Sequence, residues 1–428
     1  MAGEIRSTKA DSRLAGADFV RATACLMVLV HHLVQRLSPE AVVPAARSAY
    51  LFALEGAFGV AAFFVLSGYL LARPFWQALD AGAAMPSLRT YALRRTARIV
   101  PAFWLALTVS FILSVVLFEV PFDGTLLLRY LAGLFLVSDW HWSTLFPVEF
   151  NGPLWSIGFE VTSYVLLPFC LAVLFWFRPT GVWPRRFVWV AVIVAVVLAH
   201  WLIVRHLPVD TRGRGWQFGL QGGAKVWVPR FNPFGFFAIF AIGTLAAGLQ
   251  VRWARSSSLL FDALALAGLA LAIWSMTWPI GHRDIEGYGF AQIPYAYPWF
   301  PLAVGLVLAT LPSSALLGRL ADNAVAVFLA RISFGIYVWH FLVIETLRQV
   351  WLPSLTHGGI SDIGTWLAAC AAVSAISIAL GTASFYLLEN PVIRWARTFE
   401  RPQPSGRAPR PADERARAGI RAMPARES

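Results

Sequence analysis

Long apolar runs recur along the whole sequence, and each is close to the roughly 20 residues that a helix needs to cross a bilayer. Ten candidate spans lie near residues 19–37, 51–72, 101–118, 154–177, 187–204, 233–249, 258–278, 297–311, 332–351 and 363–388. Because lipid offers the backbone no hydrogen-bond partners, runs of this length are expected to be helices, and none has the alternating pattern of a membrane β-barrel strand. We therefore predict an all-α, polytopic membrane helix bundle of about ten transmembrane helices.

The composition supports a membrane protein. Only 14% of the residues are charged and 58% are hydrophobic, whereas about a quarter of an average soluble domain is charged. The three cysteines, Cys25, Cys170 and Cys370, all lie in apolar runs, so we expect neither disulfides nor a metal site. The first apolar run contains Asp18 and Arg21, which indicates an uncleaved first helix rather than a signal peptide.

In a soluble protein the net charge of +12 would suggest nucleic acid as a partner. In a membrane protein, the distribution of Lys and Arg between the two sides of the membrane decides what the charge indicates. If the N-terminus is cytoplasmic, 24 of the 35 Lys and Arg residues lie on the inner side and 9 on the outer side. The positive-inside rule then places both termini in the cytoplasm, and no nucleic acid is expected. The outer loop 205–231 carries five basic residues of its own, which either weakens this topology or indicates contact with an anionic molecule outside.

The chain is expected to contain one folded domain and a tail. Residues 1–399 hold all the spans, while 400–428 are rich in Arg and Pro with almost no apolar content, so we predict a disordered cytoplasmic tail near anionic lipid. The outer segment 119–153 contains an apolar stretch, 126–137, that is too short to span. We expect this stretch to lie at the membrane interface or to re-enter the membrane.

Ionisable side chains inside the spans need a reason, because each costs at least about 2.5 kcal/mol at the centre of a membrane helix. Arg21 and His32 are eleven residues apart, which puts them on one helix face and about 16 Å apart along the axis. Glu160, near the start of the fourth span, is expected about 9 Å below the outer surface, at the depth of His32. Such a pair would orient the imidazole as a general base, although two unrelated polar residues lining a water-filled cavity also fit.

Further polar residues lie in the second and third spans. Arg95 and Arg98 lie three apart at the start of the third span and would project from one side. Their guanidinium groups suit phosphates, but anchoring to lipid headgroups explains them equally. Ser67-Gly68-Tyr69 in the second span fits close helix packing.

On the ninth span, Ser333, Tyr337 and His340 form a single stripe, which indicates either an interhelical hydrogen-bond network or a site. Glu345 and Arg348, three apart on the same span, are most simply an internal ion pair.

Six motifs in a fixed order give the chain a family resemblance. They are Arg21 to His32, Gly59 to Leu70, Arg94 to Pro101, Pro153 to Glu160, Ser333 to His340, and the weaker Glu389-Asn390-Pro391. In this set the sequence resembles the acyltransferase-3 family of integral membrane O-acyltransferases, which modify bacterial surface glycans and some small molecules. No C-terminal extracytoplasmic esterase-like domain is recognisable, so the chain is expected to be a stand-alone member.

The resemblance implies a location in the bacterial cytoplasmic membrane and a reaction. The donor would be a cytoplasmic acyl-CoA, most often acetyl-CoA, and the acceptor a hydroxyl of a surface glycan, a lipid-linked sugar or another glycosylated molecule. His32 would be the general base, oriented by Glu160, with an acyl-histidine intermediate as the alternative. Arg21 would position the donor, and Arg95 and Arg98 would bind the phosphates of coenzyme A. The tunnel for donor or acceptor would be lined by Ser67, Tyr69, Trp155, Ser156, Tyr337 and His340.

A polytopic transporter or flippase is the competing hypothesis, because intramembrane charges often couple to substrate or proton movement. No inverted-repeat pattern in the sequence favours it. The two hypotheses differ in product, since only an acyltransferase releases free coenzyme A thiol.

Overall fold

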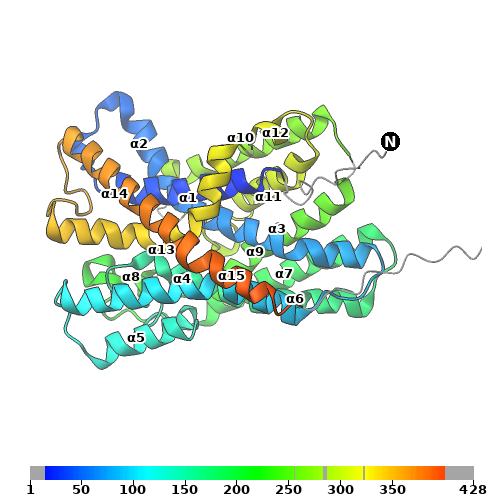
Figure 1. Cartoon of the computed structure of the whole chain (residues 1–428), viewed down its shortest axis with the longest axis horizontal. Helices are drawn as coiled ribbons and strands as arrows, with labels where there is room; N and C mark the ends of the chain where they lie inside the picture. The colour runs from blue at the N-terminus through cyan, green and yellow to red at the C-terminus, as the bar shows by residue number, and fades with distance from the viewer. Residues whose placement is uncertain (1–14, 255, 283–286, 322, 401–428) are drawn as a thin grey trace, which may run out of the picture.

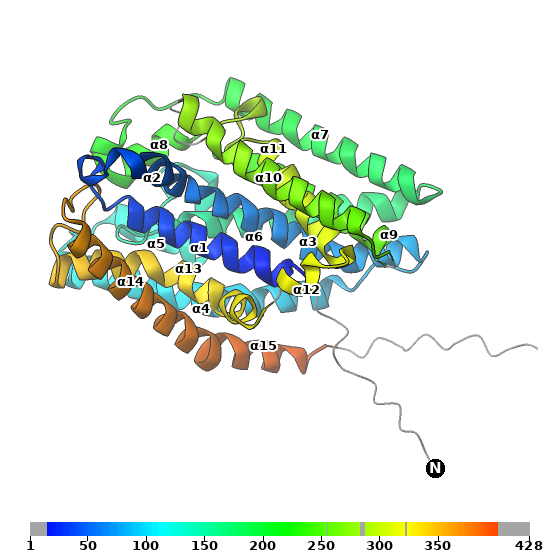
Figure 2. The ribbon, with the colours of Figure 1, turned by 90° about the horizontal axis from the view of Figure 1, so that it is seen from above.

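The computed structural model describes residues 15–254, 256–282, 287–321 and 323–400. These residues form a helix bundle without a β-strand, in which most of the long helices run along the longest axis (Figures 1 and 2). The long helices are α1 (Ala17–Val34), α3 (Gly59–Asp80), α4 (Leu88–Val116), α6 (Trp155–Phe177), α7 (Val182–His206), α9 (Pro233–Trp253), α10 (Leu259–His282), α13 (Ala324–Val350) and α14 (Ile363–Ala383).

Shorter elements connect the long helices. The short α-helices are α2 (Arg47–Leu54), α5 (Gly124–Leu134), α8 (Gly219–Trp227), α11 (Trp299–Thr310), α12 (Leu317–Ala321) and α15 (Asn390–Arg397). The 3-10 turns are η1 (Pro39–Ala41), η2 (Pro44–Ala46), η3 (Glu55–Phe58), η4 (Ser138–Trp140), η5 (Gly152–Leu154), η6 (Trp216–Phe218), η7 (Phe290–Gln292) and η8 (Leu311–Ser313), and η9 (Ser384–Glu389) is π-helical.

The predicted all-α membrane bundle is confirmed. Within the described residues, nine helical segments are long and apolar enough to cross a membrane. The predicted span 297–311 is instead the 12-residue helix α11. It is short because the preceding chain is folded into the bundle, where Ile293 and Tyr297 are buried, so less of the segment remains to form helix.

The centre of the bundle depends on close contact between α3 and α9. A Cβ atom added to Gly68 would lie 2.0 Å from the carbonyl oxygen of Phe240, and one added to Gly243 would lie 1.8 Å from that of Val65. No side chain fits between the two backbones at these positions. The packing interpretation of the glycine beside Ser67 is therefore confirmed.

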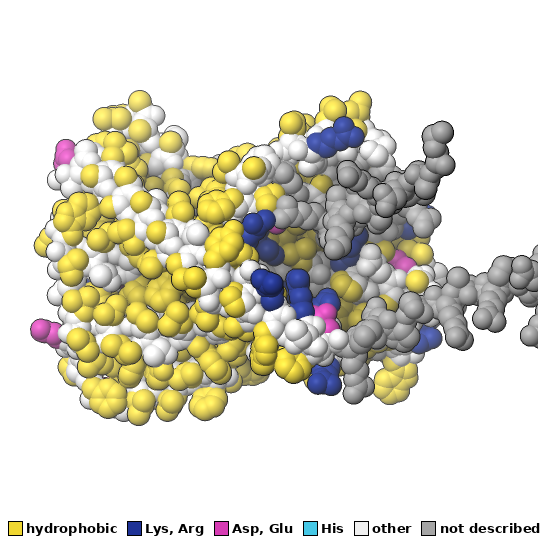
Figure 3. Space-filling model, viewed as in Figure 1, with side chains coloured by type: hydrophobic (Ala, Val, Ile, Leu, Met, Phe, Trp, Pro, Cys, Tyr) yellow, Lys and Arg dark blue, Asp and Glu magenta, His cyan; other side chains and the backbone are white. Residues whose placement is uncertain are grey.

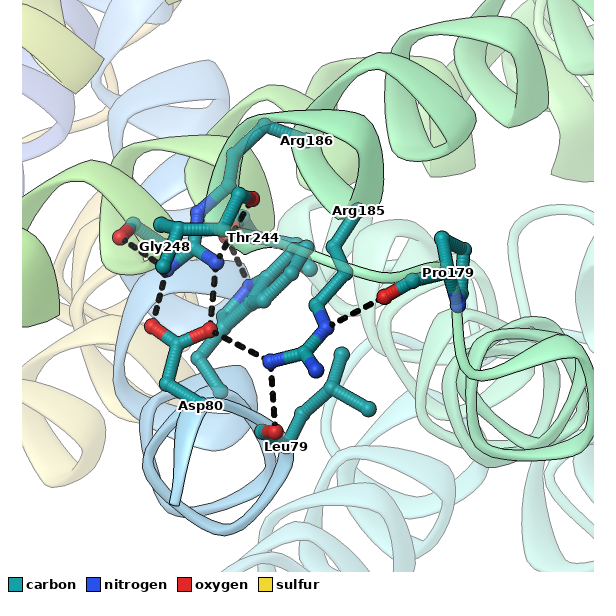
Figure 4. A network of polar contacts seen from close by, with 9 residues as sticks. Leu79, Asp80, Pro179, Arg185, Arg186, Thr244 and Gly248 are labelled. Atoms are coloured by element: carbon teal, nitrogen blue, oxygen red, sulfur yellow. Dashed lines mark hydrogen bonds and ion pairs between the residues drawn. The ribbon is translucent and has the colours of Figure 1, made fainter. Parts of the chain in front are cut away.

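A half-buried carboxylate ties the ends of three helices together (Figure 4). Asp80, at the end of α3, accepts hydrogen bonds from both terminal nitrogens of Arg186 at 2.5 Å each and from Arg185 at 3.4 Å. The same Arg186 donates to the carbonyl of Gly248 in α9 at 2.8 Å. This network fixes α7, which lies at the edge of the bundle (Figure 2), against α3 and α9.

The connection between α5 and α6 folds back into the bundle. Leu145 and Val148 are fully buried, and the backbone here is held by Arg129, which donates to the carbonyls of Phe146 at 2.7 Å and Val148 at 3.2 Å. The buried Asn151 amide donates to the carbonyl of Val338, in the middle of α13, at 2.9 Å. Helix α6 therefore begins inside the bundle and not at its surface.

Both ends of the described chain lie at one end of the bundle, because Asp18 near the start of α1 and Glu400 after α15 line the same cavity. Lys and Arg side chains gather on the visible face there (Figure 3). We call this the basic end, and the other the opposite end. The predicted tail lies outside the described residues apart from Glu400.

Candidate active site

A central cavity of about 80 Å³ lies between α1, α3, α4, α6 and α13. It is large enough to hold several water molecules. The structure brings seven of the eleven predicted site residues to its wall: Arg21, Ser67, Arg95, Arg98, Ser156, Glu160 and Tyr337. Residues from five helices that are far apart in sequence thus face one space.

Glu160 is held by two hydroxyl groups in this cavity. Ser67 Oγ donates to Glu160 Oε1 at 3.0 Å, and the Tyr164 hydroxyl donates to the same oxygen. Sequence reasoning missed Tyr164, although its position four residues after Glu160 places both side chains on one face of α6. The carboxylate therefore belongs to the central cavity together with Arg21.

The predicted pairing of Glu160 with His32 is wrong in this structure. His32 Nδ1 lies 3.1 Å from Gln35 Oε1, and Glu160 bonds to Ser67 and Tyr164 instead. The depth estimate assumed that α6 starts at the membrane surface. Because α6 begins inside the bundle, Glu160 lies deeper, near the level of Arg21.

The three predicted arginines differ in their partners. Arg98 forms an ion pair with the fully buried Glu389 at 3.1 Å, and Glu389 also accepts from Ser384 Oγ at 3.1 Å. In the described part of the chain, Arg21 and Arg95 have no carboxylate oxygen within 4 Å. Positive charge therefore remains available at the wall of the central cavity.

A second cavity of about 690 Å³ opens at the basic end and shares Arg21, Arg95 and Arg98 with the central cavity. We call it the arginine cavity. Its charged lining consists of Asp18, Arg21, Arg94, Arg95, Arg98, Arg331, Arg397 and Glu400. Six arginines face two carboxylates, and one carboxylate, Glu400, forms an ion pair with Arg94 at 2.5 Å. Such an excess of guanidinium groups favours an anionic ligand. Sequence reasoning missed Arg331 and Arg397, because they come from distant helices.

His32 lies among other imidazoles farther along α1. Its ring centroid is 5.2 Å from that of His340 and 4.8 Å from that of His31. His340 Nδ1 lies 2.8 Å from the Tyr337 carbonyl and 3.1 Å from the Ile336 carbonyl, so it donates to the backbone. The buried His340 Nε2 has no hydrogen-bond partner among the described residues.

The predicted stripe on α13 (Ser333, Tyr337 and His340) connects the central cavity to His32. Ser333 and Tyr337 line the central cavity, and His340, one turn beyond Tyr337, contacts His32. The Tyr337 hydroxyl lies 2.6 Å from Ser156 Oγ and donates to the Pro153 carbonyl at 2.9 Å. These bonds confirm an interhelical link for Tyr337, whereas Ser333 and His340 bond to carbonyls of α13 itself.

Three predicted lining residues do not line the central cavity: His340, which lies beside His32, and Trp155 and Tyr69. Trp155 is buried in an aromatic cluster with ring centroids 5.2 Å from Trp227 and 5.4 Å from Phe231. Tyr69 is fully buried, on a different face of α3 from Ser67. Both belong to the packed core, so the prediction that they line the tunnel is wrong. The Glu345–Arg348 ion pair is confirmed at 2.8 Å.

Comparison with known proteins identifies the family. The chain matches the family described as "Acyltransferase domain" over residues 14–382. It is 26% identical to Nodulation protein 10 of Rhizobium leguminosarum bv. viciae over 78% of this chain and 82% of that protein. It is 25% identical to Acyltransferase MdmB of Streptomyces mycarofaciens over 84% and 86% of the two chains.

A third relative is longer than this chain. O-acetyltransferase OatA of Staphylococcus aureus is 24% identical over 79% of this chain but only 52% of its own length. No solved structure matches the chain. The match over residues 14–382, together with the membrane bundle, shows that this chain belongs to the acyltransferase-3 family of multi-pass membrane acyltransferases.

Proposed function

We propose that the protein transfers an acyl group, most simply acetyl, from acyl-CoA to a hydroxyl of a surface glycan or other glycosylated acceptor. The basic end would face the cytoplasm of a bacterium and the opposite end the outside. The observation that carries the proposal is the arginine cavity, which adjoins the central cavity and from there the stripe that leads to His32. The name O-acetyltransferase, printed for the relative OatA, agrees with it.

The donor would bind with its phosphates in the arginine cavity. Guanidinium groups form bidentate, charge-assisted hydrogen bonds with phosphate oxygens, and Arg21 and Arg95 lack carboxylate partners among the described side chains. The pantetheine arm would then run through the central cavity and past Phe63 and Tyr337, whose ring centroids are 5.9 Å apart. About 16 Å of helix rise separates Arg21 from His32, so Arg21 would position the donor.

The transfer would take place beside His32. The acceptor oxygen attacks the thioester carbon while His32 Nε2 removes its proton. The carbon–sulfur bond breaks, and the leaving thiolate takes the proton back from the imidazolium, which gives the ester and free coenzyme A thiol. A route through acyl-histidine, with His32 as the nucleophile, would give the same products.

Thiol release tests the proposal. Purified protein in nanodiscs would be mixed with acetyl-CoA and crude bacterial envelope glycan, and the parent compared with His32→Ala. His141→Ala is the matched control, because His141 is exposed and lies outside the cavities described above. We expect acceptor-dependent release in the parent and the control and none in His32→Ala. Equal release in all three would remove His32 from the mechanism, and substrate flux into vesicles without thiol release would support a transporter.

A further inference from the structure

The side chains of His31, His32 and Gln35, at the C-terminal end of α1, form a continuous hydrogen-bond chain. His31 Nδ1 meets the carbonyl oxygen of Leu54 in α2, Gln35 Nε2 lies 3.0 Å from His31 Nε2, and Gln35 Oε1 lies 3.1 Å from His32 Nδ1. We propose that Gln35, held by His31, is the positioning residue that keeps His32 in the tautomer with a free Nε2 lone pair. The inference rests on the proposed function, because it assigns the orientation of the proposed base.

The chain of bonds starts from an atom that can only accept. A backbone carbonyl oxygen has no hydrogen to give, so the hydrogen of this bond must sit on His31 Nδ1. A neutral His31 then carries its lone pair on Nε2. The Leu54 carbonyl therefore sets the tautomer of His31.

The tautomer of His31 in turn fixes the side-chain amide of Gln35. An amide nitrogen only donates, so Gln35 Nε2 must face the His31 lone pair. The reversed amide would set its oxygen against that lone pair and lose the bond. Gln35 Oε1 is consequently turned toward His32.

An amide oxygen only accepts, so His32 Nδ1 must carry the hydrogen of the last bond. The lone pair of neutral His32 then lies on Nε2, where a general base or a nucleophile needs it. The orientation that the sequence assigned to Glu160 is therefore supplied from the same helix, by a neutral amide three residues after the base.

The other polar groups around His32 do not accept the hydrogen of His32 Nδ1 in place of Gln35. His340 uses the hydrogen on its Nδ1 for the backbone carbonyls of α13, and its Nε2 has no hydrogen-bond partner among the described residues. Arg36 has no acceptor atom, and it pairs with Glu345 at 3.2 Å. His31, Arg36 and His340 are the titratable or charged groups that act on His32.

Steady-state kinetics with acetyl-CoA and envelope glycan would test the relay in the full-length protein. Gln35→Leu removes the acceptor, and we expect kcat to fall about 10- to 100-fold with little change in KM for acetyl-CoA. Gln35→Glu keeps an acceptor oxygen and should retain most of the activity. Its negative charge stabilises the imidazolium, so the acid limb of kcat/KM should move to higher pH.

A second substitution separates orientation from packing. His31→Phe removes the anchor of the amide, and we expect part of the loss seen in Gln35→Leu but no further loss when the two are combined. The thermal unfolding midpoint of the Gln35 variants should stay near that of the parent, because the backbone bonds of Gln35 do not involve its side chain. That of His31→Phe should fall, because the bond to the Leu54 carbonyl is lost.

Each remaining outcome decides against one specific assignment. If His32→Ala is inactive but Gln35→Leu keeps the parent kcat, the relay is wrong while the base assignment stands. Equal losses in Gln35→Leu and Gln35→Glu, without a shift of the acid limb, would show that Gln35 only packs. Full activity of His32→Ala would instead overturn the proposed base itself.

Discussion

Asp139 offers a quantitative test of the structure, because its carboxylate is buried in the connection between α5 and α6 and outside the membrane-spanning helices. Its side chain accepts from Thr162 Oγ1 at 2.8 Å. The other carboxylate oxygen and the neighbouring Ser138 Oγ are buried without hydrogen-bond partners among the described residues. Burial raises the pKa of Asp139 from 3.8 to about 6, and the bond from Thr162 acts in the opposite direction.

The direction of this pKa shift determines how the stability of the folded protein changes with pH. The folded protein binds the Asp139 proton more tightly than the unfolded chain, so the stability from the neutral acid is fully present below pH 3.8 and lost as the pH rises to about 6. The shift of roughly two pKa units corresponds to about 3 kcal/mol at neutral pH. Asp139→Asn removes the cost of burying a charged carboxylate at neutral pH, since an amide carries no charge and can keep the bond from Thr162.

Thermal unfolding followed by tryptophan fluorescence in one detergent would measure the effect between pH 4.5 and 8. We expect Asp139→Asn to stabilise the protein by up to about 3 kcal/mol at pH 7.5 but by only about 1 kcal/mol at pH 4.5, where the folded carboxyl is still neutral. Glu40→Gln is the control, because Glu40 is exposed and should change neither midpoint. A loss of stability at pH 7.5, or the same gain at both pH values, would refute the claim that the charged carboxylate is poorly solvated.

Two further predictions concern the arginine cavity and the centre of the bundle. Glu400→Gln frees Arg94 from an exposed ion pair, which is worth about 0.2–1 kcal/mol, so KM for acetyl-CoA should fall by up to about fivefold; a higher KM would exclude Arg94 from donor binding. Gly243→Ala would place its Cβ 1.8 Å from the Val65 carbonyl oxygen, so the folded yield and the unfolding midpoint should drop. Gly124→Ala, where the added carbon meets nothing within 4 Å, should behave like the parent, and equal behaviour of the two variants would contradict the tight α3–α9 contact.

The sequence predicts the fold well because bilayer thickness sets the length of each helix. Nine spans agree with the structure among the described residues. The exception, α11, has the same apolar composition, and its shortness depends on how the chain before it, with Ile293 and Tyr297, packs into the bundle. That packing is tertiary and leaves no periodic signal.

The motifs predict which helices meet at the site but not which residue of each motif faces it. Successive helix residues point about 100° apart, so a contiguous motif cannot turn every side chain to one cavity. Ser67 and Ser156 face the central cavity, whereas Tyr69 and Trp155 are buried in the core.

The predicted depth of Glu160 is wrong for a different reason. The rise of a helix gives the distance of a residue from the helix start, and the sequence does not reveal the depth at which α6 begins. That depth is set by Asn151, which bonds to the middle of α13. A folded-back connection of this kind moves every residue of the following helix inward, and so Glu160 meets Ser67 and Tyr164.

The separation between the two parts of the site bears on the donor. Arg21 lines the arginine cavity, and His32 lies about 16 Å farther along the same helix. Under the proposed function, a donor held by its anionic end must carry its acyl group on a long, slender arm past the Phe63–Tyr337 contact. A compact donor such as an acyl phosphate would leave its carbonyl carbon beside Glu160, far from the imidazole. The spacing of Arg21 and His32 on one rigid helix would then act as a length requirement, which coenzyme A thioesters satisfy and short acyl donors do not.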